Sequence, residues 1–149
     1  MVSFIDILRK LMEGTYSTMT GSPDAPETFR EFVEEIKVKV PELRDKDDWE
    51  VENTVLEAID YARHKLCSQI KKAEVVPATP DYYGGITVYT CYHPDIGRFY
   101  LVIDEEEDAS SGYAHYSFTI TKNRRKALRE YEERIKAWKE EEVEFEETI

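Results

Sequence analysis

The sequence predicts one α+β domain: three N-terminal helices, a three-stranded antiparallel meander and a C-terminal helix, packed in layers. The chain has 149 residues, of which 41% are hydrophobic, so residues 1–149 are expected to enclose a single core. Apolar residues recur at helical spacing up to about residue 73, alternate with period two from about residue 86, and return to helical spacing near residue 123.

The first two helices follow from caps and apolar stripes. Ser3, with Asp6 three residues later, is a typical N-terminal cap, and Gly14 is predicted to end the first helix. Residues 15–26, TYSTMTGSPDAP, are predicted to form a polar loop because Gly, Ser and Pro punctuate them. The second helix is predicted over residues 26–40, with Pro41 as its stop.

The longest helix is predicted over residues 48–73. Asp47 followed by Glu50 is a capping-box pattern, and apolar residues keep helical spacing from Val51 to Ile70. Such a stripe is long enough to support a sheet.

Three strands and a last helix complete the chain. Residues 86–93 and 113–121 alternate in polarity, whereas RFYLVI, residues 98–103, is nearly continuously apolar, as expected for a central strand covered on both faces. The last helix is predicted from about Asn123. Residues 140–149 are mostly Glu and are expected to form a frayed acidic tail.

The tripeptide His93-Pro94-Asp95 joins the first two predicted strands. It resembles the His-Pro-Asp loop of J-domain co-chaperones, but that loop joins two helices, and GGITVYT before it here lacks helical spacing. Pro94 presets the first corner of a type I turn, and Gly97 tolerates the left-handed conformation that closes a hairpin. We therefore interpret the tripeptide as a hairpin turn.

A zinc site is a less favoured hypothesis. His64 and Cys67 are three residues apart on the predicted long helix, while Cys91 and His93 share one face of a strand. Because these spacings match no zinc knuckle, two reduced, apolar thiols are the preferred interpretation, and no cofactor is expected. The chain also lacks a glycine-rich phosphate loop, a nucleophile elbow and an HExxH motif.

The formal net charge of −12 restricts the partners. Phosphate backbones and anionic lipids repel such a chain, so we expect neither direct nucleic-acid binding nor membrane binding, but a basic protein partner. With two cysteines and no long apolar stretch, the protein is expected to be soluble and cytoplasmic.

Two residue types are predicted to bind this partner. The acids lie before the longest helix and in the run at 104–108, and four tyrosines, Tyr83, Tyr89, Tyr100 and Tyr113, are predicted to share one outer face of the sheet or its entry loop. The predicted partner-binding residues are Asp45, Asp47, Asp48, Tyr89, Tyr100, Asp104, Glu105, Glu106, Glu107, Asp108 and Tyr113.

The leading hypothesis is a non-catalytic inhibitor whose carboxylates replace nucleic-acid phosphates and block a nucleic-acid-binding or nuclease-like protein. Immunity proteins against nuclease toxins and phage anti-defence proteins have this general character. One alternative is a metal-dependent enzyme that uses His93, Asp95, Asp104 and His115. A second is a self-associating structural protein that forms a homodimer through the tyrosine-rich face, and a third is an acidic domain whose charge only keeps it soluble.

Overall fold

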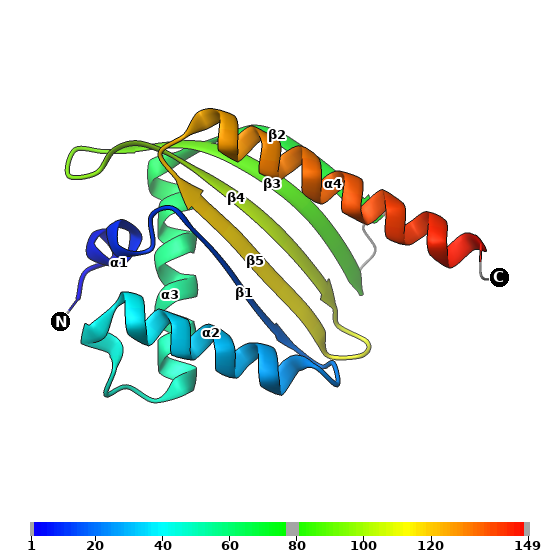
Figure 1. Cartoon of the computed structure of the whole chain (residues 1–149), viewed down its shortest axis with the longest axis horizontal. Helices are drawn as coiled ribbons and strands as arrows, with labels where there is room; N and C mark the ends of the chain where they lie inside the picture. Colours follow the sequence, from blue (N-terminus) through cyan, green and yellow to red (C-terminus); the bar gives the residue numbers. More distant parts are fainter. Residues whose placement is uncertain (1, 77–80, 148–149) are drawn as a thin grey trace.

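In the computed structural model, a five-stranded antiparallel sheet lies between two layers of helices (Figure 1). The structure describes residues 2–76 and 81–147, with the backbone alone described for residues 75–76 and 141–147. In chain order the elements are α1 Phe4–Lys10, β1 Gly14–Thr20, α2 Ala25–Lys39, the 3-10 helix η1 Pro41–Leu43, α3 Asp48–Tyr61, the π-helix η2 Ala62–Leu66, β2 Cys67–Val76, β3 Tyr82–His93, β4 Gly97–Asp108, β5 Tyr113–Thr121 and α4 Arg124–Glu147.

The α+β class holds, but the predicted architecture is wrong. The sheet has five strands in the order β1-β5-β4-β3-β2. Of its two edge strands, β1 interrupts the helices between α1 and α2, and β2 replaces the end of the predicted third helix. Three helices therefore do not form an uninterrupted N-terminal block. The three strands of the predicted meander are present as the neighbours β3, β4 and β5.

Both additional strands replace elements that the sequence predicted differently. Residues 14–20 were predicted largely as a polar loop, but they pair with β5 along their whole length. Tyr16 and Thr18 face the core, and the β-branched and aromatic residues of this segment suit a strand. The predicted helix over 48–73 ends at Tyr61, passes through η2 and becomes β2 at Cys67. Its stripe through Val51, Val55 and Ile59 is buried as predicted.

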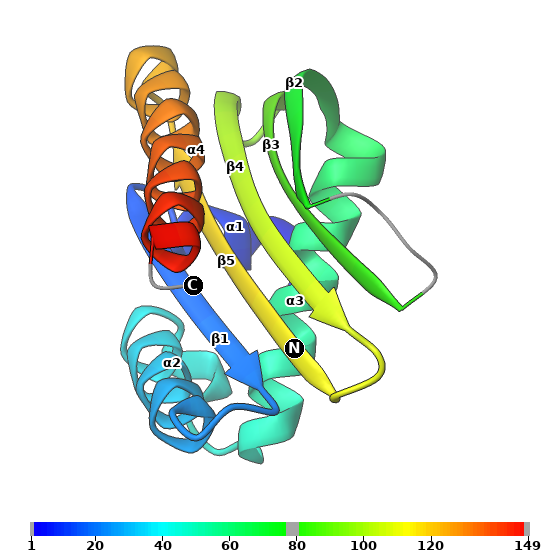
Figure 2. The ribbon, with the colours of Figure 1, turned by 90° about the vertical axis from the view of Figure 1, so that its right-hand side faces the viewer.

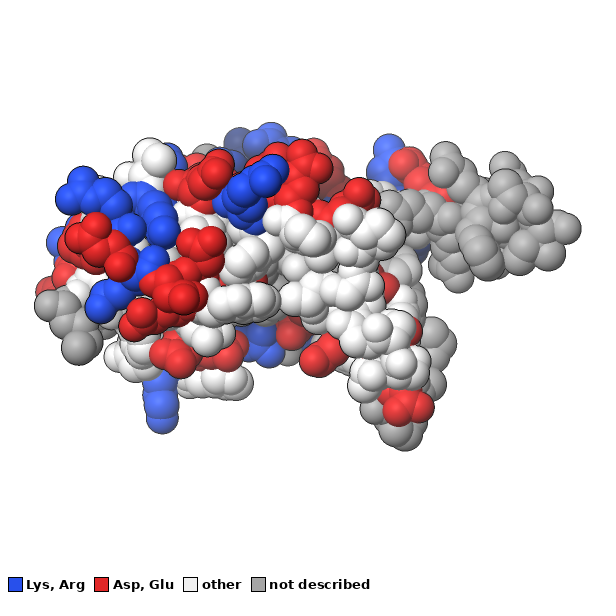
Figure 3. All heavy atoms as spheres, turned by 90° about the horizontal axis from the view of Figure 1, so that it is seen from below, with Lys and Arg blue, Asp and Glu red and all other residues white. Residues whose placement is uncertain are grey.

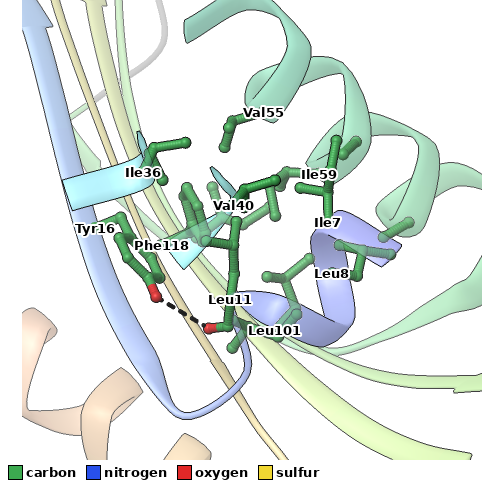
Figure 4. Close-up of a cluster of buried hydrophobic side chains, with 14 of the residues drawn as sticks. Ile7, Leu8, Leu11, Tyr16, Ile36, Val40, Val55, Ile59, Leu101 and Phe118 are labelled. Atoms are coloured by element: carbon green, nitrogen blue, oxygen red, sulfur yellow. Dashed lines mark hydrogen bonds between the residues drawn. The ribbon is translucent and has the colours of Figure 1, made fainter. Parts of the chain in front are cut away.

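The main core lies between the sheet and the layer formed by α1, α2 and α3 (Figure 4). Ile7 and Leu8 of α1, Ile36 of α2 and Ile59 of α3 are all fully buried there. On the sheet side, Phe99, Leu101, Ile103, Phe118 and Ile120 close this core. The hydroxyl of Tyr16 donates to the carbonyl oxygen of Leu11 at 3.3 Å, which satisfies the buried phenol.

The second core is smaller and lies under α4, on the opposite face of the sheet (Figure 2). Ile86, Val88 and Val102 pack there against Ala127 and Tyr131, with the predicted stripe of Leu128, Ile135 and Trp138 at its margin. Strand β4 is therefore buried on both faces, as its continuous apolar run predicted. No helix in the described part of the chain is long and apolar enough to span a membrane.

The local caps and the hairpin turn are confirmed. The Ser3 hydroxyl accepts a hydrogen bond from the Asp6 N–H at 3.1 Å, and Asp47 Oδ1 accepts from the Trp49 N–H at 2.9 Å. In the turn, the Ile96 N–H donates to the His93 carbonyl at 3.0 Å, and Gly97 takes the left-handed conformation with φ 89°.

The end of the first helix differs from its prediction. Helix α1 ends at Lys10, and Glu13, with φ 65°, takes the left-handed conformation before Gly14 enters β1. The Glu13 carboxylate accepts hydrogen bonds from the Thr121 hydroxyl and from the Lys122 N–H at 2.7 Å. Helix α4 extends to Glu147, and the side chains of the predicted frayed tail beyond residue 140 lie outside the described residues, so the fraying stays a prediction.

Candidate functional site

The acids predicted before the longest helix lie at the start of α3. Asp45 and Asp47 are exposed, and Asp47 caps the helix. Asp48 pairs with Lys37 of α2, with 3.3 Å between the Lys37 Nζ and the Asp48 Oδ1 atoms. Exposed pairs of this kind contribute little to stability, so these acids remain available to a partner.

An apolar hollow lies beside these acids, and the sequence did not single it out. Trp49 is 59% exposed, although its ring packs against that of Phe29 with 4.7 Å between centroids. The hollow has a volume of about 370 Å³ and is lined by uncharged residues from the end of β1, the turn after it, and helices α2 and α3. Its lining residues are Met19, Thr20, Gly21, Ser22, Ala25, Pro26, Phe29 and Trp49. We call this feature the Trp49 hollow.

The acidic run at 104–108, predicted to bind the partner, does not present its carboxylates on one face. All five residues belong to β4, where successive side chains point to opposite faces, so Asp104, Glu106 and Asp108 face α4 while Glu105 and Glu107 face α3. Arg134 pairs with Asp104 at 3.4 Å and Arg63 with Glu105 at 3.1 Å.

The other three acids of the run, Glu106, Glu107 and Asp108, have different surroundings. The Tyr82 hydroxyl donates a short hydrogen bond to Glu106, and burial together with this bond raises the pKa of Tyr82. Hydrogen bonds from Ser110 lower the pKa of Asp108, which stabilises the turn into β5. Glu107 is exposed. The run is therefore dispersed over two faces and largely occupied by partners within the chain.

The four tyrosines do not share one face, which corrects that prediction. Strand parity places Tyr83 and Tyr89 on the face toward α3, and Tyr100 and Tyr113 on the face toward α4. Tyr100 is only 8% exposed, and the Arg124 guanidinium lies over its ring at 5.8 Å from the centroid. A homodimer through one tyrosine-rich surface therefore loses its predicted basis.

The residues of the enzyme alternative fall into two separate places. His93 and Asp95 lie in the hairpin between β3 and β4, where the Asp95 N–H donates to His93 Nδ1 at 3.0 Å. Asp104 and His115 instead line one groove beside α4, together with Arg134. The four residues thus do not form one site.

The two cysteines form a disulfide, so the predicted free thiols are wrong. Cys67 begins β2 and lies opposite Cys91 of β3, with their Cα atoms 4.0 Å apart. The zinc candidates His64, Cys67, Cys91 and His93 therefore offer no thiolate ligand in this state. Among the described residues, no group of three or more His, Cys, Asp and Glu side chains is placed to hold a metal ion.

Within the described residues, the basic first turn of α4 pairs with the residue before β1. Lys126 lies 3.6 Å from the Glu13 carboxylate. Burial opposes ionisation of Glu13, but hydrogen bonds from Lys122 and Thr121 and the charge of Lys126 lower its pKa. Arg124 and Arg125 are exposed and form no ion pair within the described residues.

Charges are unevenly distributed over the face seen from below the helical layer (Figure 3). Lys and Arg side chains intermingle with carboxylates over one half of this face, whereas the half toward the β4–β5 hairpin is mainly uncharged, with scattered carboxylates. On this face the acidic charge is therefore not one continuous field, and it borders an uncharged surface.

Trp49 and Arg134 are the residues that sequence reasoning missed. Trp49 follows two acids at a helix N-terminus, a position where an aromatic side chain has no stripe to join, and that mismatch was the available signal. Arg134 has one local partner, Glu130, which is an ordinary helix pair, and its partners on the sheet, Asp104, Ser117 and Thr119, are far from it in sequence, so the sequence carried no signal for the site.

Comparison with known proteins gives no relative from which a role could be transferred: no family model, curated protein or solved structure matches the chain.

Proposed function

We propose that the protein is a non-catalytic binding protein whose Trp49 hollow and neighbouring acids contact a basic protein partner. The observation that carries this proposal is Trp49 itself, a large apolar side chain 59% exposed at the border of an uncharged hollow. Tryptophan is the residue type most often found at the energetic centre of protein interfaces.

The Trp49 hollow suits an apolar anchor of the partner. Phe29 holds the Trp49 ring from one side, which reduces the rotamer freedom that binding has to freeze. Ala25 and Pro26 supply small or rigid walls, so an aliphatic or aromatic side chain could displace water there at low cost.

The charge next to the hollow indicates what surrounds that anchor. The two segments at its border, residues 24–27 and 45–50, contain six carboxylates and a single lysine. Such a rim attracts lysine and arginine, accelerates encounter and loses its effect as salt increases. An apolar side chain flanked by basic residues is thus the expected recognition element.

The partner class follows from the same chemistry. Proteins that bind nucleic acids present basic surfaces to phosphates, and carboxylates on this chain would compete for those surfaces. An inhibitor of immunity-protein or anti-defence type therefore remains the proposed role, with Asp45, Asp47 and Asp48 in the contact and the run at 104–108 no longer at its centre.

A cytoplasmic location also remains a proposal. Disulfides are rare in the cytosol, so the redox state of Cys67 and Cys91 in the native cell bears directly on it. Alkylation of cell lysates prepared in acid, followed by mass spectrometry, would measure that state.

The test of function starts from capture in native-host lysate, followed by purification of the captured protein and measurement of its Kd. Trp49→Ala should weaken binding by about 30-fold, in line with a hot-spot loss of about 2 kcal/mol. Tyr92→Ala is the matched control. Tyr92 is a similarly exposed aromatic residue, at 52%, but it lies outside the Trp49 hollow, at the C-terminal end of β3 beside the β3–β4 hairpin.

Salt provides the second criterion. The Kd should increase between 50 and 300 mM salt, and Asp47→Asn together with Glu50→Gln should reduce that dependence. An acidic or uncharged captured protein, or equal Kd values for the wild type and Trp49→Ala, would refute the proposal.

A further inference from the structure

The face of the sheet toward α4 carries two successive rows of side chains. Asp104 of β4 lies opposite Ser117 of β5, which in turn lies opposite Ser17 of β1. Two residues further along the strands, Glu106, His115 and Met19 form the next row in the same way. Each row begins with a carboxylate. The two carboxylates, Asp104 and Glu106, lie on the same face because residues two apart in a strand share a face.

The first row is filled by a guanidinium from α4. Arg134 Nη1 donates to the Ser117 hydroxyl at 2.9 Å and lies 3.4 Å from the Asp104 carboxylate, while Nη2 donates to the Thr119 hydroxyl at 3.2 Å. The Arg134 side chain is only 14% exposed. The sheet thus recognises a guanidinium by one carboxylate and two hydroxyl groups.

No described side chain fills the second row in this way. One turn beyond Arg134, helix α4 presents Ala137 and Trp138, and the small Ala137 side chain leaves space over the row. A groove of about 410 Å³ results. Its lining residues are Met19, Glu106, Tyr113, His115, Ala137 and Trp138, with Asp104 and Arg134 at one end. Within the described residues, Glu106 forms no ion pair, and its bond from Tyr82 uses only one carboxylate oxygen.

We infer that this groove binds the guanidinium of an arginine side chain on a polypeptide. The bound group would sit over the second row as Arg134 sits over the first, with one of its N–H groups directed to Glu106. Trp138 provides an aromatic wall against which a planar guanidinium can stack. Two carboxylates and one guanidinium border the groove, so its charge favours a cation.

This inference deepens the proposed function and, as an assignment of partner chemistry, rests on it. Met19 borders both the groove and the Trp49 hollow, so one partner segment that carries an apolar anchor and a nearby arginine could occupy both. The guanidinium site itself can be tested without any partner.

The experiment is an NMR titration of the purified full-length protein with N-acetyl-arginine amide, followed at the Trp138 indole and at His115. Binding is expected with a Kd on the order of 1 mM, as befits a single side chain. The citrulline analogue, which is nearly isosteric but uncharged, should bind at least about 10-fold more weakly because it lacks the charge-assisted hydrogen bond.

Two neighbouring variants provide a matched comparison. Glu106→Gln should weaken arginine binding by about 10-fold, whereas Glu107→Gln, which removes the same charge from the opposite face of β4, should leave it unchanged. Equal effects of the two variants would overturn the inference, as would equal binding of the citrulline analogue.

Ala137→Arg supplies an internal guanidinium at the position that the ligand should take. Because residue 137 is exposed, this variant should fold, and it should abolish arginine binding. Unchanged binding would refute the site. A failure of arginine to bind would leave the Trp49 hollow as the proposed surface, and a partner that ignores Trp49→Ala would leave the arginine site intact, so the two proposals fail separately.

Discussion

Reduction of the disulfide between Cys67 and Cys91 should destabilise the protein by several kcal/mol. The bond joins two residues 24 apart in sequence, and it holds the first residue of edge strand β2 against β3. Loop-closure entropy for a loop of that length gives about 3.5 kcal/mol, mostly through the unfolded chain. In a domain of this size, such a loss lowers Tm by about 10 °C.

Urea denaturation of the same wild-type protein, with and without dithiothreitol, measures this difference. The reduced protein should unfold at lower urea, and its m value should increase because the unfolded chain without the bond exposes more surface. The double variant Cys67→Ala/Cys91→Ala should resemble the reduced wild type and should no longer respond to dithiothreitol.

Two results would refute this reasoning. If the oxidised and the reduced protein differ in free energy of unfolding by less than about 0.5 kcal/mol, which is about the precision of the measurement, the bond adds nothing to stability. Labelling of both cysteines by iodoacetamide in air-oxidised native protein would show that no bond forms, since a disulfide sulfur does not react.

Two further predictions concern buried polar groups. Arg134→Met should cost about 3 kcal/mol because it leaves Asp104 buried without its cation, and adding Asp104→Asn should recover part of that loss in urea denaturation; a single variant within 1 kcal/mol of the wild type contradicts this. Burial and the nearby Glu35 carboxylate raise the pKa of Tyr16 to about 12, so the neutral phenol stabilises the fold fully below pH 10, and this contribution is lost as pH rises from 10 toward 12. Stability measured from pH 9 to 11 should therefore fall more steeply for the wild type than for Tyr16→Phe, and parallel curves would show that Tyr16 ionises normally.

The elements that local patterns define were predictable from the sequence. Caps at Ser3 and Asp47, the break at Pro41 and the turn around His93 each depend on residues within a few positions, and all of them are confirmed. Strands β3, β4 and β5 were found because two of them alternate in polarity and the third is apolar on both faces.

Strand β1 was missed because its buried face is partly polar. Tyr16 and Thr18 point into the core, and the Thr18 hydroxyl donates to the buried carboxylate of Glu52 at 2.6 Å. A segment of Thr, Ser and Tyr with polar residues on both faces resembles a loop by composition alone. Only its pairing with β5, which is about a hundred residues away in sequence, gives it a buried side.

Strand β2 was missed because helical spacing continues by chance beyond the end of the helix. Leu66 and Ile70 fit the stripe of α3, yet Leu66 packs with the three-helix core and Ile70 with the core under α4. The chain must therefore leave the helix between them to reach both faces of the sheet. Spacing along one segment cannot reveal a change of layer, although the disulfide partner of Cys67 would have indicated it.

The same non-local pairing decides which acids are available to a partner. Counted along the chain, the run at 104–108 is the densest acidic feature, but the strand divides it between two faces, and Arg134 and Arg63 neutralise two of its members. Asp45 and Asp47 belong to a smaller cluster of acids, yet they lie at an exposed helix start, and among the described residues neither side chain forms an ion pair. Accessible charge beside an apolar anchor is what an interface requires, because charge guides encounter while buried apolar area holds the complex. The Trp49 hollow combines both, and for that reason it is a better candidate than the most acidic stretch of sequence.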